Sequence, residues 1–367
     1  MIKICHMTSA HSSTDTRIFY KQCTSLSKAG YDVCLVAQGE SYESNGIKIV
    51  GVPRINGGRL NRMTKVAKSV YKKALETDAD IYQIHDPELL RYALKLKKKN
   101  KTVIFDSHED FMVILLEKSY IPAIFRPVLN LFFNSYYRVV LKKFDAIITV
   151  TPHIYDKIKR VNRNTFMITN YPIIHNYSEE REYVFNNRIV FAGAIVKDWC
   201  HHTIINSLEK CINVRYILFG SGNEKYINEL KTLTKWEFVD YLGKIPYTDV
   251  SEKLKDGSIG MAVAAYSRGA AYKIGSLGNQ KIFEYMAEGL PIICTDFILW
   301  KEIIDKYKCG ICVNPYNSDE IADAINYLLK NPEISKEMGE NGRQAILKDF
   351  NWGIEEQKLL TLYKSLV

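Results

Sequence analysis

One stretch in the second half of the chain, Gly275–Thr295, contains the residue types that hold a nucleotide diphosphate. A loop with glycine and serine leads into Asn279, a residue type that begins helices, and the predicted helix carries Glu284 on its first full turn. Backbone N–H groups at the start of a helix have no partner within it and carry partial positive charge, which suits a phosphate. A carboxylate one turn further on accepts hydrogen bonds from a ribose diol. We therefore expect a nucleoside diphosphate to bind here.

Two polar clusters in the first half of the chain follow apolar runs that we predict to be strands. His85 and Asp86 end the run IYQI, and the segment from Asp106 to Asp110 ends the run TVIF. Ligands of α/β folds bind at the carboxyl ends of strands. The clusters predict either a site in which His108 forms hydrogen bonds or handles a proton, or capped loops that hold no ligand.

The first predicted strand leads into a polar loop, residues 8–17, that has no glycine. The loop therefore lacks the glycine pattern that binds a dinucleotide. Asp15 can cap the helix that follows. Arg17 would oppose the helix dipole in the first turn, so we expect it to have a ligand or an ion-pair partner.

Glycine turns end two predicted strands in the second half of the chain. Gly193 is followed by Lys197, which either faces a diphosphate or lies on the surface. Gly220 and Gly222 would allow backbone to approach a ligand closely. Three more residues in the second half of the chain are candidates for binding the nucleotide. One is a tyrosine on which the base could rest, and two are cations that precede the stretch Gly275–Thr295: Tyr241, Arg268 and Lys273.

Short apolar runs alternate with helical patterns along the chain, which is typical of a doubly wound α/β fold with parallel sheets. The polar segment 171–187 interrupts the pattern, and 367 residues suffice for two domains. We predict Rossmann-like domains at 1–175 and 176–351, whose carboxyl edges face a central cleft, and a last helix at 352–367 that crosses back onto the first domain. The predicted strands are Ile2–Met7, Val33–Ala37, Ile47–Val52, Ile81–Ile84, Val103–Phe105, Ala146–Val150, Phe166–Ile168, Ile189–Ala192, Arg215–Phe219, Phe238–Tyr241, Ile259–Ala264, Ile292–Cys294 and Gly310–Val313.

Positive charge is concentrated in the first half of the chain. Residues 1–175 hold 27 Lys and Arg against 15 Asp and Glu, a net charge of +12, whereas the other residues hold 23 against 26, a net charge of −3. An anionic partner is therefore expected for the first half. Residues 111–144 mix aromatic, aliphatic and basic side chains, which favours either contact with an anionic membrane surface or ordinary core-packing helices. No nucleic-acid-binding module is recognisable, so we expect no nucleic acid partner.

The eight cysteines are scattered, and only Cys309 and Cys312 have the C-x-x-C spacing, without a second pair beside them. Reduced thiols suit a cytoplasm. The sequence shows no signal peptide and no run of about 18 apolar residues. We expect a cytoplasmic protein that is peripheral on the inner face of a membrane.

With these residues in place, the chain resembles the retaining glycosyltransferases of family 4, which have the GT-B fold, over essentially its whole length. The resemblance rests on the stretch NQKIFEYMAEGLPII, which is similar to the donor-site signature of that family. The segments FDSHED and TDTRIF are similar to a subgroup that builds bacterial surface polysaccharides. Such enzymes move a sugar from a nucleotide donor to an acceptor that is often linked to a lipid diphosphate.

The resemblance implies that Glu284 holds the donor ribose, that Lys281 and the amides of Gly275–Gly278 bind the diphosphate, and that His108 lies near the transferred sugar. This chain has Ser276 where the family has a first glutamate. The usual arginine and lysine of the family would fall near Ala194 and Cys200, and the residues that could replace them are Lys197, Arg268, Lys273 and His201.

These inferences assign residues to two sites. The predicted donor-binding residues are Gly193, Lys197, Gly220, Gly222, Tyr241, Arg268, Lys273, Ser276, Leu277, Gly278, Lys281 and Glu284. The predicted acceptor-binding residues are His11, Asp15, Arg17, His85, Asp86, His108 and Glu109. His108 and Glu284 are the residues predicted to act in catalysis.

We expect a UDP- or GDP-linked sugar as donor and no cofactor, because backbone N–H groups and lysines can stabilise the leaving diphosphate without a metal. The acceptor is expected to be a lipid-linked or polysaccharide precursor. Two alternatives remain at this point: another GT-B enzyme, such as an inverting transferase or a sugar-nucleotide epimerase, and a non-catalytic module that binds a membrane surface.

Overall fold

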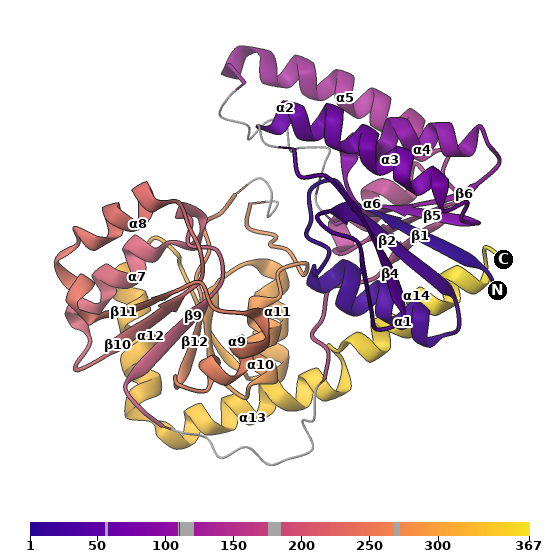
Figure 1. Ribbon diagram of the computed structural model, residues 1–367. Helices are drawn as coiled ribbons and strands as arrows, with labels where there is room; N and C mark the ends of the chain where they lie inside the picture. The colour runs from indigo at the N-terminus through magenta and orange to yellow at the C-terminus, as the bar shows by residue number, and fades with distance from the viewer. Residues whose placement is uncertain (56–57, 109, 111–120, 175–184, 268–271) are drawn as a thin grey trace. The chain divides into compact units, whose positions relative to one another are not determined.

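The computed structural model describes residues 1–55, 58–108, 110, 121–174, 185–267 and 272–367. The chain divides into two compact units, one of Met1–Asn170 with Trp352–Val367 and one of Tyr171–Asn351 (Figure 1). The division falls before Tyr171, whereas the sequence placed it at residue 175. Tyr171 belongs to the second unit because its ring packs edge-on against Phe283 and Phe350, at centroid distances of 4.7 and 5.3 Å.

The first unit is built on an eight-stranded sheet in the order β3-β4-β2-β1-β5-β6-β7-β8, in which only β3 and β4 pair antiparallel. Because β1, β5 and β6 are parallel neighbours, their carboxyl ends meet at one edge of the sheet. The sequence predicted every strand of this sheet except β3, whose residues YES have no apolar pattern. The strands are β1 Lys3–Met7, β2 Asp32–Gln38, β3 Tyr42–Ser44, β4 Ile47–Val52, β5 Ile81–Ile84, β6 Thr102–Ser107, β7 Ala146–Thr149 and β8 Thr165–Met167.

The C-terminal helix α14 (Trp352–Lys364) belongs to the first unit, where it packs against η1 and α1 (Figure 1). The Trp352 indole N–H donates to the Ser25 hydroxyl at 2.9 Å, and the buried Glu355 carboxylate accepts from the Thr169 amide at 2.7 Å. The other helices and helical turns of this unit are η1 Thr16–Cys23 (a π-helix), α1 Thr24–Lys28, α2 Arg59–Asn61, η2 Arg62–Val66, α3 Ala67–Glu76, η3 Pro87–Leu89, α4 Leu90–Lys97, η5 Ala123–Phe125, α5 Arg126–Leu141 and α6 Pro152–Lys159.

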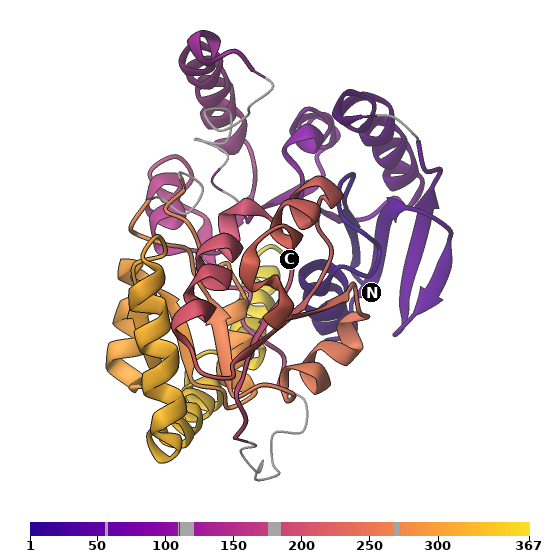
Figure 2. The same ribbon diagram turned by 90° about the vertical axis from the view of Figure 1, so that its left-hand side faces the viewer.

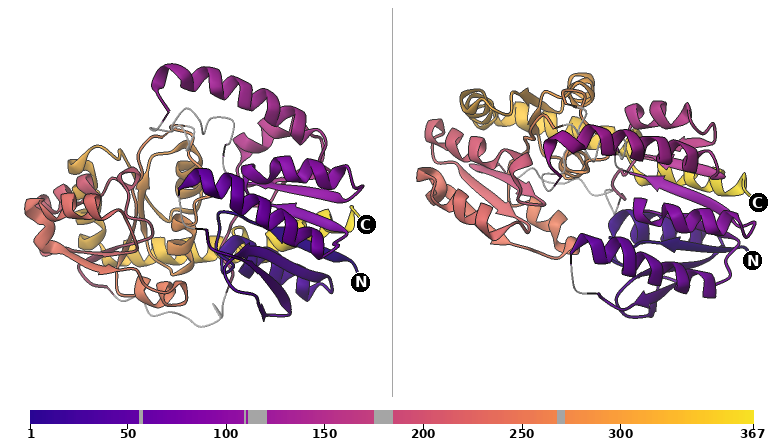
Figure 3. Two further views of the ribbon diagram at one scale, coloured as in Figure 1. Left: turned by 45° about the horizontal axis from the view of Figure 1, so that its top comes forward. Right: turned by 90° about the horizontal axis from the view of Figure 1, so that it is seen from above.

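The second unit is built on a six-stranded parallel sheet in the order β11-β10-β9-β12-β13-β14. Helices cover both faces of each sheet (Figure 3), which explains why the strands read as almost continuously apolar runs. The strands are β9 Arg188–Ala192, β10 Arg215–Phe219, β11 Val239–Gly243, β12 Ile259–Ala262, β13 Ile292–Thr295 and β14 Gly310–Val313. The helices and helical turns are η6 Lys197–Trp199, α7 His201–Ser207, η7 Leu208–Lys210, α8 Glu224–Lys231, η8 Thr234–Phe238, α9 Tyr247–Leu254, α10 Lys281–Ala287, α11 Ile298–Tyr307, α12 Ser318–Lys330 and α13 Pro332–Lys348.

Helix α10 and strand β13 confirm the local structure predicted for the stretch that opened the sequence. The Asn279 side chain accepts at 3.1 Å from the amide of Lys281, the first residue of α10. The helix ends at Ala287, and Gly289, two residues further on, has a φ of +66°, a conformation that favours glycine. The chain then turns and enters the buried strand β13.

Candidate functional site

Asp106, at the carboxyl end of β6, is the centre of a buried polar cluster in the first unit. Its carboxylate accepts from Arg17 Nε and Nη2 at 2.9 and 2.8 Å and from Gln22 Nε2 at 2.8 Å. His85 Nδ1 lies 3.2 Å from the same carboxylate. Although burial opposes ionisation, Arg17 and His85 hold the pKa of Asp106 well below its usual range. The partner that the sequence led us to expect for Arg17 is therefore Asp106.

A chain of polar contacts continues from this cluster to the C-terminal helix. His85 Nε2 lies 3.0 Å from His6 Nδ1. The Tyr363 hydroxyl of α14 lies 3.5 Å from His6 Nε2 and donates to Gln83 Oε1 at 2.6 Å. Gln83 in turn donates to Gln22, which closes the chain. All of these side chains are buried, so α14 helps to fix the polar groups below the sheet edge.

His108 follows β6 at the same edge of the sheet. Its Nδ1 lies 3.3 Å from the carbonyl oxygen of Asp106, which can only accept, so Nδ1 carries the proton and Nε2 the lone pair. The His108 ring packs edge-on against His11 at a centroid distance of 5.1 Å. Burial lowers the pKa of His108, and the charges of His11 and Arg17 lower it further against the opposing effect of Asp106. The neutral imidazole can accept a hydrogen bond from a sugar hydroxyl at Nε2.

Asp15 caps η1, as the sequence predicted. Its Oδ1 accepts from the amides of Arg17 and Ile18, each at 2.9 Å. His11 Nδ1 lies 3.4 Å from the other oxygen. Burial would raise the pKa of Asp15, but the hydrogen bonds from His11 and the Ile18 amide lower it to about 2. The carboxylate is therefore ionised and fixes the loop that carries His11.

Asp86 holds the same loop from β5. Its Oδ2 accepts from the Thr8 hydroxyl at 2.9 Å and from the Ser9 amide at 2.6 Å. Its Oδ1 lies 3.5 Å from His11 Nε2. These contacts make Asp86 a positioning residue for the loop. Glu109, the last predicted acceptor-binding residue, lies outside the described residues.

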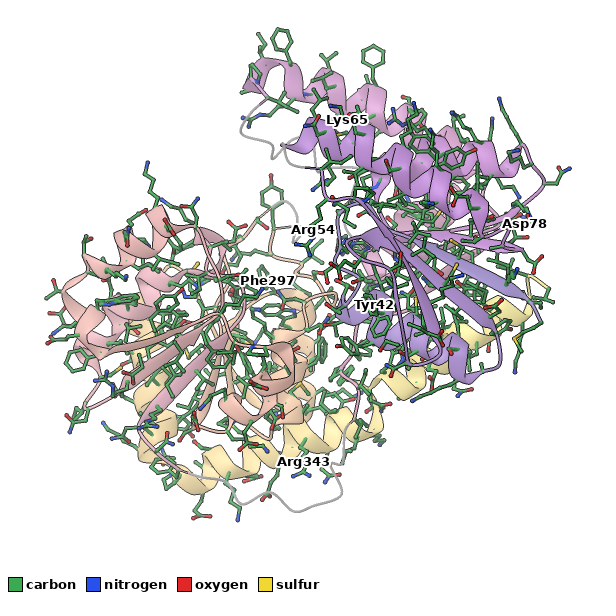
Figure 4. The ribbon with its side chains drawn as sticks, viewed as in Figure 1. Tyr42, Arg54, Lys65, Asp78, Phe297 and Arg343 are labelled. Atoms are coloured by element: carbon green, nitrogen blue, oxygen red, sulfur yellow. The ribbon has the colours of Figure 1, made fainter. Side chains whose placement is uncertain are left out.

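The loop before α10 rests on α11 in the second unit. The Trp300 indole N–H donates to the Ser276 carbonyl at 2.9 Å, and the Ser276 hydroxyl accepts from the Gly278 amide at 3.1 Å. Gly275 has a φ of +84°, and a Cβ at this position would collide with Phe297, which Figure 4 shows inside the second unit. The Ser276 hydroxyl, at the position of the missing glutamate, is thus used within the loop.

The Lys281 ammonium lies in an aromatic recess beside the turn at Gly193. Its Nζ is 5.0 Å from the centre of the Phe191 ring and 4.7 Å from that of Trp199, and a Cβ at Gly193 would collide with it. Within the described part of the chain, no ion pair joins Lys281 to a carboxylate. Burial lowers the pKa of Lys281, and nearby Glu284 offsets only part of this effect. The ammonium is therefore half-buried against two aromatic rings and not ion-paired within the described residues, so the recess suits an anionic ligand.

The glycine turns that follow β9 and β10 pack against each other. The backbone of Gly193 lies where a Cβ of Gly220 would be, and the backbone of Ile195 lies where a Cβ of Gly222 would be. Ile195 and Gly222 also form an isolated parallel bridge. Close packing of backbone therefore accounts for Gly220 and Gly222 without a ligand.

Two of the other predicted cations, Lys197 and Lys273, have partners elsewhere in the second unit. Lys197 Nζ lies 3.2 Å from Glu229 Oε2, and its side chain is 70% exposed. Lys273 Nζ lies 5.1 Å from the centre of the Tyr266 ring and is exposed. Arg268 lies outside the described residues. Lys281 is thus the described cation that lies nearest to the Gly193 turn.

Three further residues that were predicted to bind the donor lie in the second unit. Glu284 is half-buried on the first turn of α10, three positions after Lys281. The Tyr241 hydroxyl donates to the Gly220 carbonyl at 3.4 Å. Leu277 is half-buried against the core of the unit. Only Glu284 offers a charged group from this set.

His201 is a buried core histidine. Its Nδ1 lies 3.0 Å from the Tyr216 hydroxyl, and its ring packs edge-on against Phe191 at a centroid distance of 4.6 Å. Burial, with a smaller contribution from Lys281, lowers the pKa of His201 to about 3. The neutral, packed ring is unsuited to replace a phosphate-binding cation.

We expect the substitution His201→Gln to flatten the acid side of the stability profile of the second unit. An unfolded histidine has a pKa of about 6.5, so between about pH 6.5 and pH 3 the unfolded chain binds more protons than the folded one and stability falls with falling pH. From about pH 7 to pH 5 the wild type should lose about 2 kcal/mol through this residue, and the variant should not. Urea denaturation at both pH values, followed by tryptophan fluorescence, measures this difference. Parallel profiles would show that His201 is not the titrating group.

The structure also bears on three further features: metal-binding groups, membrane-spanning helices and paired cysteines. Among the described residues, no group of three or more His, Cys, Asp or Glu side chains is arranged to hold a metal ion. No helix within the described ranges has both the length and the hydrophobicity needed to cross a bilayer. All eight cysteines are free thiols, and Cys312 Sγ lies 3.8 Å from Cys294 rather than pairing with Cys309.

Sequence reasoning missed the polar groups beneath the acceptor-side residues. Gln83 had a readable signal, since it is a polar residue in the otherwise apolar strand IYQI. Gln22 and Tyr363 had none, because each meets its partners only in the folded unit.

Two family models match the chain, one for each unit. The model described as "Glycosyltransferase Family 4" matches residues 16–170, and the model described as "Glycosyl transferases group 1" matches residues 178–345. Among curated relatives, an uncharacterised glycosyltransferase of Methanocaldococcus jannaschii is 25% identical over 223 residues, 59% of this chain and 58% of the relative. Spore coat protein SA of Bacillus subtilis is 31% identical over 83 residues, 22% of each protein. The chain thus matches less than two thirds of the length of either relative.

Solved structures match the chain over its full length. Sucrose-phosphate synthase of Thermosynechococcus elongatus aligns with a TM-score of 0.77 and 14% identity, covering 100% of this chain and 99% of that one. Anabaena HepE in complex with UDP and glucose aligns with a TM-score of 0.74 and 14% identity, covering 100% of both chains. Identities this low establish the fold alone. Together with the two family models, which span most of the sequence, they show that the chain belongs to the glycosyltransferases of family 4, with the GT-B fold.

Proposed function

We propose that this glycosyltransferase moves a sugar from a UDP- or GDP-sugar to an acceptor and retains the configuration of the transferred carbon. The proposed acceptor is a lipid-linked or polysaccharide precursor of a bacterial surface glycan, which a cytoplasmic enzyme reaches at the inner face of the membrane. Solved structures of HepE hold UDP and UDP-glucose, which supports a nucleotide donor and favours UDP.

The observation that carries this proposal is the half-buried ammonium of Lys281, which lies against Phe191 and Trp199 beside the turn at Gly193. The usual cations of the family would fall near Ala194 and Cys200, neither of which is a charged residue. Lys281 reaches the adjacent turn at Gly193 from α10. A preorganised cation at this turn would stabilise the negative charge that develops on the departing diphosphate, an effect that is usually the largest contribution to such catalysis.

The acceptor side supplies a neutral histidine rather than a nucleophile. His108 carries its proton on Nδ1, so Nε2 can accept a hydrogen bond from a hydroxyl of the transferred sugar. Asp106 is fully occupied by Arg17 and Gln22 and cannot attack a sugar. We propose a front-face displacement in which the acceptor oxygen bonds to the anomeric carbon, the bond from that carbon to the diphosphate oxygen breaks, and the departing phosphate takes the acceptor proton.

We expect the substitution Glu284→Ala to raise the donor KM by about 10- to 100-fold, because a charged acceptor of two ribose hydrogen bonds is lost. Glu284→Asp, which keeps the charge on a shorter side chain, should give a smaller increase. Nucleoside diphosphate release, measured with a panel of UDP- and GDP-sugars, gives both values. Glu302→Ala, on the exposed face of α11, is the control and should leave the KM unchanged. An unchanged KM in Glu284→Ala would exclude the ribose role.

The product distinguishes this proposal from the other GT-B activities. Assignment of the anomeric configuration by NMR should show retention with the preferred donor. An inverted product would identify an inverting transferase, and conversion of the donor without any acceptor would identify an epimerase. A protein that neither transfers nor hydrolyses any donor of the panel would be a non-catalytic module.

A further inference from the structure

Large apolar side chains are exposed on the turn η5 and on most of helix α5. The exposed fraction is 78% for Ile124, 67% for Leu131 and 69% for Phe132. We define the α5 apolar surface as Ile124, Phe125, Val128, Leu129, Leu131, Phe132, Tyr136 and Val139, all of which are exposed. Exposed apolar residues gathered on one element are typical of a binding surface, whereas scattered ones are ordinary.

The C-terminal end of α5 fixes the helix to its unit. Tyr137, Val140 and Leu141 are buried, and the Tyr137 hydroxyl lies 2.9 Å from the Ser107 hydroxyl below it. The Tyr137 ring also packs edge-on against Phe105 at a centroid distance of 6.1 Å. Figures 1 and 2 show the other end of α5 extending beyond the strands of this unit. The apolar surface is thus carried by a helix that is anchored at one end.

The charge of this segment has one sign. Residues 121–144 contain no Asp or Glu and four cations, Arg126, Arg138, Lys142 and Lys143. The last three are exposed and lie at the C-terminal end of the apolar surface, Arg138 just before Val139 and the two lysines after it. At the opposite end, a hollow of about 260 Å³ is lined by Ile121, Pro122, Phe125, Val128 and Leu129. The segment therefore joins apolar and aromatic side chains to cations, the composition of helices that lie in a membrane interface.

We propose that the α5 apolar surface enters the headgroup region of an anionic lipid bilayer and that Arg138, Lys142 and Lys143 bind the lipid phosphates. The inference names the surface that would bring the enzyme to a lipid-linked acceptor, and in that respect it rests on the proposed function. Phe132 and Leu131, the most exposed large apolar residues within the helix, enter the interface, and the cations remain at headgroup level. The 16-residue helix lies in the interface rather than crossing it.

The charge also argues against a second copy of the chain as the occupant. Two α5 helices packed together would bring two segments of positive charge into contact without a carboxylate on either. An anionic bilayer supplies both the apolar phase and the counter-charge, so it satisfies both features of the surface.

Flotation of the full chain with phosphatidylcholine vesicles, with and without phosphatidylglycerol, tests this inference. The wild type should float with phosphatidylglycerol vesicles at low salt and less at high salt. Leu131→Asp combined with Phe132→Asp should lower the partition coefficient by at least about 30-fold. Lys142→Gln combined with Lys143→Gln should lower it by about 10-fold, on phosphatidylglycerol vesicles only. Ile212→Asp, at a residue of the second unit that is 74% exposed, is the matched control and should float like the wild type.

Equal flotation of the wild type and the Leu131→Asp, Phe132→Asp variant would overturn the inference. So would wild-type dimers that this variant converts to monomers in light scattering, since a second copy would then be the occupant. Nucleoside diphosphate release with a water-soluble acceptor should be the same in both proteins, which shows that the variant is folded. A wild type that floats but releases no diphosphate would leave the docking surface in place and remove the proposed function.

Discussion

Replacing Lys281 by methionine should lower kcat/KM for glycosyl transfer by at least about 100-fold, because the leaving diphosphate loses its stabilising cation. The apolar part of the side chain is retained, so packing against Phe191 and Trp199 should persist. The same substitution should raise the stability of the second unit, since it removes the cost of partly burying an ammonium that has no ion pair among the described residues. Steady-state diphosphate release and urea denaturation measure the two effects. Opposite changes in activity and stability are expected of a residue held in place for a ligand.

The matched control is Lys197→Met, which removes a cation of the same unit that pairs with Glu229. Its ammonium is exposed, so we expect at most about a threefold loss of activity and little change in stability. A larger loss in Lys197→Met than in Lys281→Met would reverse the assignment of the diphosphate cation.

Local patterns in the sequence were sufficient for most of the fold. The loop, helix, glycine stop and strand around α10 were predicted because each depends on neighbours in the chain, such as Asn279 at the start of the helix and Gly289 at its end. The parallel strands were predicted because both faces are covered and the runs are apolar. β3 was missed, since its residues have no apolar pattern and it joins the sheet by backbone pairing with β4.

The choice among cations could not be made from the sequence. Lys197 is close to Gly193 in the sequence, whereas Lys281 is distant in the sequence. Only the structure shows that the ammonium beside Gly193 is that of Lys281. The glycine pattern was also ambiguous, because Gly220 and Gly222 are required by the neighbouring backbone. Side-chain direction and contacts between distant segments decide both questions.

Only part of the polar cluster around Asp106 was predicted from the sequence. His108 and Arg17 were recognised from strand ends and helix starts, which are local features. The groups that fix them come from the whole chain: Tyr363 is contributed by the last helix and Gln83 by the strand beside β1. No local pattern connects residues so far apart in sequence.

Asp106→Asn should lower the free energy of unfolding of the first unit by about 3–5 kcal/mol, the usual cost of breaking a buried ion pair from one side. The side chains of Arg17 and Asp106 are 6% and 0% exposed, so the guanidinium would be left buried without its counter-charge. Arg17 and Gln22 both donate hydrogen bonds to the carboxylate oxygens of Asp106. The amide N–H₂ of the variant is itself a donor, so it could not accept one of these bonds. Urea denaturation, with hydrogen exchange in β1 and β6 to assign the transition to this unit, measures the loss.

Asp240→Asn provides the control, because Arg215 donates to Asp240 through the same two nitrogens on the surface of the second unit. These side chains are 43% and 35% exposed, and such pairs contribute at most about 1 kcal/mol.

The stability contributed by the buried Arg17–Asp106 pair also depends on pH. Since the folded pKa of Asp106 is depressed, its contribution is fully present above about pH 4 and is lost as the pH falls further. The stability gap between wild type and Asp106→Asn should therefore be constant near neutrality and narrow below about pH 4. Equal losses of unfolding free energy in Asp106→Asn and Asp240→Asn would contradict a stabilising role of the buried charge pair. So would a stability difference between wild type and Asp106→Asn that does not change below about pH 4.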